Sequence, residues 1–203
     1  MEVFANTLTG TRALGGIALN RYIESTPDYE SWRTCIAFVL LAITDGDGYF
    51  ARRGREFQEK NESERRPWNS YGDHIADKIL VDGTMLAIAH REELNGNKFY
   101  ARMTKLATNT TMARDTVTTM DRIMADFQNI DTRAQKEGKA KALKQYGIIA
   151  LALSPIAKNQ SAKILLGTGF LYAAKESITS GISLHKHLNK RRKLRKQASS
   201  KIR

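Results

Sequence analysis

Only three prolines, Pro27, Pro67 and Pro155, interrupt the 203 residues of this chain. Proline breaks a helix, and the long stretches between these positions lack the alternation of β-branched and polar residues that is typical of strands. The sequence therefore predicts an all-α fold. Six helices are expected, over residues 7–24, 29–52, 70–93, 97–128, 138–157 and 160–190. Because no repeat or linker divides the chain, we expect one helical domain over 1–190 and a basic C-terminal tail over 191–203.

The apolar runs of the chain are short. The longest uninterrupted run is Cys35–Ile43, whereas a helix that spans a membrane needs about 20 mostly apolar residues. The mean hydropathy of −0.45 is typical of a soluble protein. Hydropathy alone therefore favours a soluble helical protein.

Positive charge is concentrated at the C-terminus. The formal net charge is +12, and residues 186–203 read KHLNKRRKLRKQASSKIR. Such a run is typical of a disordered basic tail, of a segment on the cytoplasmic side of a membrane that attracts anionic lipids, or of a nucleic-acid-binding segment. No aromatic residue is interleaved with the basic ones and no nucleic-acid-binding motif is present, so we do not expect a nucleic-acid partner.

Cysteine and histidine offer little chemistry. The single cysteine, Cys35, lies in the apolar run and is expected to pack in the core. The four histidines show no metal-ligand spacing with a thiolate or a third histidine. The sequence therefore favours neither a disulfide framework nor a zinc site.

Carboxylates and one arginine gather in two short segments, Asp47–Arg52 and Asp73–Lys78. On a helix Asp73 and Asp77 share one face, and Gly48 lets a ligand approach the backbone beside Asp47. Hard oxygen ligands near an arginine suit a divalent metal bound to a phosphoanhydride. The alternative is a set of solvated surface carboxylates, but the apolar sequence next to both segments makes unpaired charges costly.

These segments resemble the signature of the CDP-alcohol phosphatidyltransferases, which reads D-x-x-D-G-x-x-A-R and, after a spacer, G-x-x-x-D-x-x-x-D. The matching positions are Asp47, Gly48, Ala51, Arg52, Asp73 and Asp77. Two positions depart from the signature, since Thr44 stands at its first Asp and Asn69 at its second Gly. The spacer is also longer than usual, with a polar insert over 55–67 that is expected to be a loop.

The departure at Thr44 makes one metal ligand uncertain. Asp45 is adjacent, but Asp45 and Asp47 are two residues apart and therefore point about 200° apart on a regular helix. Either Asp45 substitutes through an unwound backbone at Gly46, or the site holds its metal with fewer carboxylates.

Three further matches in the expected order resemble the phosphatidylglycerophosphate synthase branch of the family. They are Asn6-Thr7-Leu8-Thr9 with Arg12, then Ala113-Arg114-Asp115 with Arg122, then Gly138-Lys139-Ala140-Lys141 with Gln145. The resemblance implies a six-helix polytopic bundle in the cell (inner) membrane. It also implies a polar cavity, the active site and the C-terminus on the cytoplasmic side, and a homodimer as a family expectation.

The resemblance also implies the chemistry. A phosphatidyl group would pass from CDP-diacylglycerol to glycerol 3-phosphate with release of CMP, assisted by two divalent ions, Mg²⁺ or Mn²⁺. Asp77 would be the general base. The implied metal ligands are Asp47, Asp73 and Asp77, with Thr44 or Asp45 nearby. The implied nucleotide-binding residues are Asp47, Gly48, Ala51 and Arg52. The candidates for the acceptor phosphate are Arg114, Lys139, Lys141 and Arg122.

Three alternatives remain open at this point. The acceptor could be another alcohol, such as inositol phosphate. The chain could be a catalytically inactive, lipid-binding member of the family, because Thr44 replaces an expected ligand. It could also be a soluble basic helical protein that binds nucleic acid.

Overall fold

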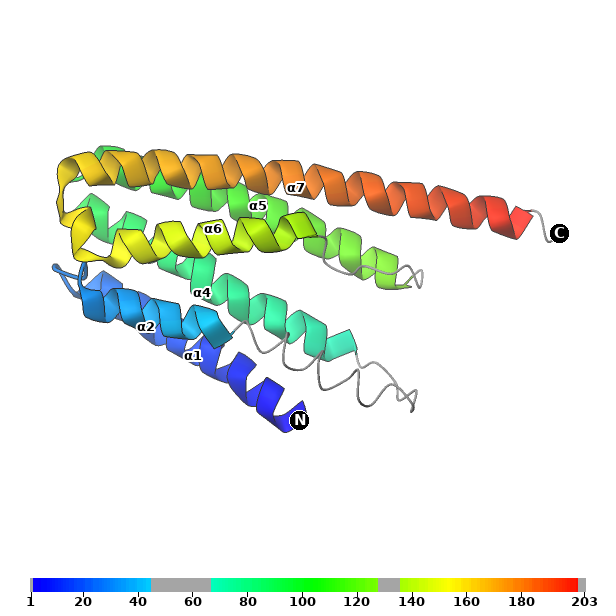
Figure 1. The fold of residues 1–203 in the computed structure, drawn as a ribbon, viewed down its shortest axis with the longest axis horizontal. Helices are drawn as coiled ribbons and strands as arrows, with labels where there is room; N and C mark the ends of the chain where they lie inside the picture. The colour runs from blue at the N-terminus through cyan, green and yellow to red at the C-terminus, as the bar shows by residue number, and fades with distance from the viewer. Residues whose placement is uncertain (1, 45–66, 128–135, 201–203) are drawn as a thin grey trace.

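A bundle of helices forms the fold, as the ribbon in Figure 1 shows. The computed structural model describes residues 2–44, 67–127 and 136–200. Within these ranges the long elements are six α-helices, and no strand occurs. They are α1 (Glu2–Ser25), α2 (Trp32–Ile43), α4 (Pro67–Leu94), α5 (Lys98–Phe127), α6 (Lys136–Leu153) and α7 (Gln160–Ser200), with a short 3-10 helix, η2 (Pro155–Lys158). The all-α prediction is confirmed for the described residues.

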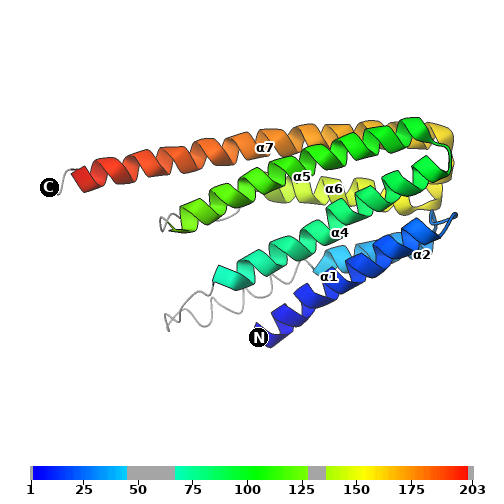
Figure 2. The ribbon, with the colours of Figure 1, turned by 180° about the vertical axis from the view of Figure 1, so that it is seen from behind.

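The two ends of the bundle differ. At one end, here called the closed end, short connections over 26–31, 95–97 and 154–159 join α1 to α2, α4 to α5 and α6 to α7. At the other, the open end, α2 and α5 end and α4 and α6 begin, and both termini lie toward it (Figures 1 and 2). α7 projects past the other helices at the open end in both views. It continues to Ser200, ten residues beyond the predicted limit.

Local chemistry explains the turns at the closed end. Ser31 caps α2, because its hydroxyl accepts a hydrogen bond of 3.2 Å from the backbone N–H of Thr34. Gly96 takes φ of 84° between α4 and α5, a left-handed conformation that glycine adopts without steric cost. Pro155 cannot continue α6, so that helix ends at Leu153 and η2 follows. The predicted helix over 138–157 is therefore too long at its end.

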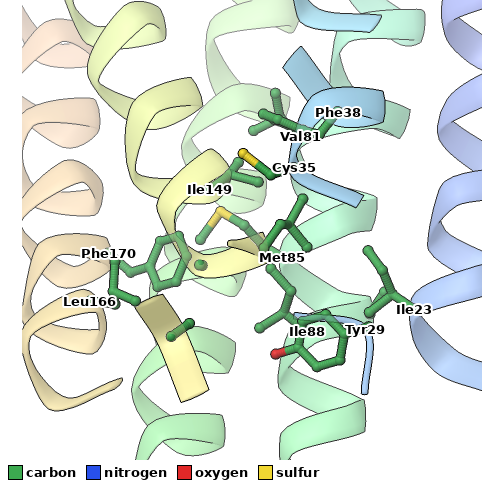
Figure 3. Packing of buried hydrophobic residues seen from close by; sticks show 14 of the residues in the cluster. Ile23, Tyr29, Cys35, Phe38, Val81, Met85, Ile88, Ile149, Leu166 and Phe170 are labelled. Atoms are coloured by element: carbon green, nitrogen blue, oxygen red, sulfur yellow. The ribbon is translucent and has the colours of Figure 1, made fainter. Parts of the chain in front are cut away.

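The core lies between the helices, and Figure 3 shows its packing. Phe38 and Cys35 of α2 meet Met85 of α4, Ile149 of α6 and side chains of α7 there. Cys35 is buried, which confirms its predicted place.

α1 packs closely against α4. A Cβ on Gly16 would lie only 3.2 Å from the Cα of Leu80, so this approach of two helices requires a glycine. Asn20 reinforces the contact, because its Nδ2 donates to the carbonyl of Ile79 at 3.2 Å and its Oδ1 accepts from Thr84 Oγ1 at 2.9 Å.

A buried ionic cluster fastens the closed end. Lys163 Nζ of α7 lies 2.9 Å from Glu30 Oε1 and 2.7 Å from Glu92 Oε2. Glu92 is fully buried and also accepts from Tyr29 Oη at 2.9 Å and Asn97 Nδ2 at 2.6 Å. The cluster thus joins the α1–α2 connection to the end of α4 and the start of α7.

α5 buries many polar side chains and exposes many large apolar ones. Its buried residues include Thr104, Thr108, Thr111, Asp115, Thr118 and Asp121, beside the apolar Tyr100, Ala101, Ala107 and Ala125. Its exposed residues include Phe99, Leu106, Met112, Val117, Met120, Met124 and Phe127, beside the charged Arg102 and Lys105. A surface helix in water shows the opposite arrangement. In the described ranges, however, no helix combines the length and the apolar character that crossing a membrane requires.

Candidate active site

The described parts of the predicted site lie in the half of the bundle nearer the open end, here called the open half (Figure 1). Thr44 follows the end of α2, Asp73 and Asp77 lie in the first turns of α4, and Lys139 and Lys141 lie at the start of α6. The predicted residues Asp45, Asp47, Gly48, Ala51 and Arg52 lie outside the described residues. The side chains of Asp73, Lys139 and Lys141 are likewise outside the description, so their predicted roles stay predictions.

Arg12 of α1 lies beside Thr44. The guanidinium is fully buried, and its Nε donates to Thr44 Oγ1 at 3.1 Å. The Thr44 hydroxyl in turn donates to the carbonyl of Leu41 at 2.6 Å. Its oxygen thus already contacts a cation where the family signature has a carboxylate. The hydroxyl suits a helix cap and a partner for Arg12 better than a metal ligand.

Asp77, the predicted general base, is held from two helices. Tyr146 of α6 donates its hydroxyl hydrogen to Asp77 Oδ1. Lys78 Nζ lies 3.8 Å from Asp77 Oδ2, within ion-pair range but too far for a hydrogen bond. The carboxyl group is about one-fifth exposed, so one oxygen is engaged and the group remains accessible.

Asp115 joins two cations. Lys78 Nζ forms an ion pair with Asp115 Oδ2, and Arg114 Nη1 donates to Asp115 Oδ1. Arg114 Nη2 donates to Ser180 Oγ of α7 at 3.2 Å. Gly181 allows this approach, because a Cβ there would lie 3.0 Å from Arg114 Nε.

These contacts form one chain of polar groups. It runs from Tyr146 through Asp77, Lys78 and Asp115 to Arg114, and it connects α6, α4 and α5. The structure therefore links the predicted base to the predicted acceptor-binding arginine through Lys78 and Asp115.

Arg122 lies away from this chain. It follows Arg114 by eight residues on the same helix, which places it about 12 Å further along the helix axis. Nearby on α5, Asp121 Oδ2 contacts His185 Nδ1 of α7 at 2.8 Å. The described contacts do not bring Arg122 together with Arg114.

Five of the residues in contact here were not among the predicted site residues. Arg12 and Asp115 belong to matched runs but had no predicted site role, and the other three are Lys78, Tyr146 and Ser180. Lys78 directly follows Asp77, and Tyr146 directly follows Gln145 at the end of a matched run, so adjacency to matched positions was the available signal. Ser180 carries no such signal, since only the packing of α7 against α5 brings it to Arg114.

Metal binding depends mostly on residues outside the description. Among the described side chains, no group of three or more His, Cys, Asp or Glu residues could hold a metal ion. Asp77 suits a divalent cation, because one of its oxygens is not hydrogen-bonded to Tyr146.

An open pocket of about 500 Å³ lies elsewhere. It sits at the closed end, where its lining includes Tyr22, Trp32 and Lys158. None of the predicted site residues lines it.

Comparison with known proteins agrees with the signature residues. A family model described as CDP-alcohol phosphatidyltransferase matches residues 2–174, which is most of the chain. The match begins with α1 and reaches into α7, and it therefore includes every described residue of the chain of contacts except Ser180. No curated protein matches the chain.

Proposed function

Because the chain belongs to the CDP-alcohol phosphatidyltransferase family, we propose that it transfers a phosphatidyl group from CDP-diacylglycerol to glycerol 3-phosphate and releases CMP. Membership of the family directly supports a transferase of phospholipid biosynthesis that uses a CDP-alcohol. The observation that supports glycerol 3-phosphate as the acceptor is the chain of contacts between Asp77 and Arg114. It gives a base and an anion-binding group in one half of the bundle.

Asp77 acts as the general base in this proposal. Its carboxylate takes the proton from the acceptor hydroxyl while that oxygen forms a bond to the β-phosphorus, which carries the diacylglycerol. The bond from this phosphorus to the bridging oxygen breaks, and its electron pair leaves with CMP. The partial exposure of Asp77 supports the role, because a base must reach the proton that it removes.

A divalent ion, Mg²⁺ or Mn²⁺, would be held by Asp47, Asp73 and Asp77, and when bound it neutralises charge on the pyrophosphate. We propose Asp45 rather than Thr44 as a further ligand, because the Thr44 hydroxyl already accepts from Arg12. Gly48, Ala51 and Arg52 are proposed to hold the nucleotide, as their signature positions imply.

Arg114 is proposed to bind the phosphate of the acceptor, together with Lys139 and Lys141. Its planar guanidinium suits phosphate oxygens. Asp115 and Ser180 hold two of its nitrogens, which fixes its orientation before any ligand arrives. Arg122, the remaining candidate for this role, lies about 12 Å further along the axis of α5 than Arg114.

We propose that the protein works in a membrane, with its open end and C-terminus at the cytoplasmic surface. The exposed Phe and Met side chains of α5 and its buried Thr and Asp side chains support this proposal, because they suit an apolar surrounding. On α7 the exposed side chains change from Ile178 and Ile182 to Lys186 and Lys190 toward the open end, as expected where a helix reaches anionic headgroups.

Extraction from membranes tests this location, and light scattering tests the oligomeric state. Extraction that requires detergent, rather than high salt or alkali, is expected for a protein embedded in the bilayer. Release by salt alone would contradict the proposal. A homodimer, which the family suggests, would appear as twice the mass of the chain in light scattering of the detergent-solubilised protein.

The activity is tested by CMP release from CDP-diacylglycerol in mixed micelles with Mg²⁺, with and without glycerol 3-phosphate. Release that depends on glycerol 3-phosphate is expected. Release only with another alcohol, such as inositol phosphate, would overturn the acceptor. No release with any alcohol or with Mn²⁺ would indicate an inactive, lipid-binding member of the family.

Two variants test the proposed roles in this assay. Asp77→Asn is expected to lower kcat by about 100-fold or more, because it removes the base and keeps the shape of the side chain. Arg114→Ala is expected to raise the KM for glycerol 3-phosphate and leave that for CDP-diacylglycerol nearly unchanged. Unchanged kinetics in both variants would refute the assignment.

A further inference from the structure

We propose that Tyr146 is a positioning residue that fixes the rotation of the Asp77 carboxylate, so that Oδ2 is the oxygen that faces the reactants. This inference rests on the proposed function of Asp77. It adds a residue that neither the signature nor the other matched motifs contain.

The geometry at Asp77 distinguishes its two oxygens. Oδ1 accepts the hydrogen bond from the Tyr146 hydroxyl. Oδ2 is 3.8 Å from Lys78 Nζ, whose close contact is with Asp115. A carboxylate with one oxygen bound to a fixed donor cannot rotate freely, so its second oxygen keeps one direction. Oδ2 is therefore the oxygen that remains for the acceptor hydroxyl, and a divalent ion held by Asp77 would contact the same oxygen.

Tyr146 is itself well anchored. Its ring packs edge-on against Phe38 of α2, with 6.2 Å between ring centroids and 67° between the ring planes. The side chain thus extends from α6, contacts α2 and reaches Asp77 of α4. Three helices determine where the hydroxyl lies, and a positioning residue needs such a fixed donor.

Tyr146 and Arg114 act on different groups. Tyr146 donates directly to Asp77, whereas Arg114, the proposed acceptor-binding residue, contacts Asp115 and Ser180 and is linked to Asp77 through Asp115 and Lys78. Loss of the tyrosine hydroxyl should therefore disturb the direction of the base and leave the acceptor site intact. A purely structural role would instead lower stability and leave turnover per folded molecule unchanged.

The test is Tyr146→Phe, which removes the hydroxyl and keeps the ring against Phe38. We expect kcat for CMP release to fall about 10- to 100-fold, with both KM values unchanged within about twofold. Tyr172→Phe on α7 is the matched control, because it removes an exposed tyrosine hydroxyl away from Asp77, and its kcat should equal that of the wild type.

A second readout does not need activity. Thermal unfolding of Tyr146→Phe, Asp77→Asn and the double variant forms a cycle, and the losses in Tm should be clearly non-additive if the hydroxyl and the carboxylate interact. Additive losses would overturn the inference, whether or not the protein is active.

The outcomes separate the two proposals. An active wild type whose Tyr146→Phe variant keeps full kcat overturns the positioning role and leaves the proposed function standing. A wild type that releases no CMP with any alcohol overturns the proposed function itself, and the positioning role fails with it.

Discussion

The buried ionic cluster at the closed end gives the sharpest test of the fold. Lys163→Met removes the cation that lies 2.9 Å from Glu30 and 2.7 Å from Glu92. Methionine keeps the length of the side chain, so the loss of charge dominates. All three ionic side chains are at most 7% exposed, and water therefore cannot replace the ammonium group well.

The loss of stability in Lys163→Met can be estimated from the groups that remain after the substitution. Two buried carboxylates would lose their shared cation, and breaking a buried pair costs about 3–5 kcal/mol. Tyr29 and Asn97 still donate to Glu92, which places the expected loss toward the lower end of that range. For a chain of this size such a loss lowers Tm by about 6–15 °C.

The assay is thermal unfolding followed by circular dichroism, with Lys144→Met as the matched control. Lys144 also lies 2.7 Å from a carboxylate, that of Glu176, but its side chain is 53% exposed. Solvent screens an exposed pair, so the control should change Tm far less. Equal shifts in the two variants would refute the reasoning that burial, and not distance, makes the Lys163 contacts important.

Three further predictions concern pH, packing and charge. Burial raises the pKa of Glu30, so the contribution of this carboxyl group to stability is present at low pH and is lost as pH rises through its folded-state pKa. Glu30→Gln should remove this part of the pH dependence, and urea titrations at several pH values that show the same pH dependence as the wild type would contradict it. Gly16→Ala should lower the free energy of unfolding by about 1–3 kcal/mol, because the backbone of α4 lies 3.2 Å from the new methyl group. Gly10→Ala, which places its methyl group with no atom within 4 Å, should not lower it, and equal free energies for the two variants would contradict the close approach. Replacement of both Lys190 and Arg191 by Glu should weaken the binding of anionic lipid to the detergent-solubilised protein by roughly tenfold or more at low salt, and an unchanged lipid titration would exclude this contact.

The sequence predicts most of the architecture because helix signals are local. The predicted helices over 70–93 and 97–128 agree with α4 and α5 to within three residues at each end, since glycine and asparagine lie between them. The predicted helix over 29–52 begins only at Trp32, after the cap at Ser31. Its last part lies outside the described residues.

The contacts of the candidate site could not be predicted in the same way. Tyr146 and Asp77 are 69 residues apart, and nothing in either segment states the relative rotation of α4 and α6. The signature names Asp77 through its spacing, whereas its hydrogen-bond donor depends on how three helices pack. The same holds for Ser180, which reaches Arg114 only because α7 lies against α5 at Gly181.

The short connections at the closed end have a consequence for the order of folding. They divide the bundle into three helical hairpins, α1–α2, α4–α5 and α6–α7, whose internal contacts are close in sequence and therefore quick to form. In the open half, Lys78 and Asp115 pair within the second hairpin, whereas the hydrogen bond from Tyr146 to Asp77 joins the third hairpin to the second. We therefore expect the carboxylate of Asp77 to acquire its fixed direction only when the α6–α7 hairpin packs against the rest of the bundle. A chain in which this hairpin has not yet packed should have no transferase activity.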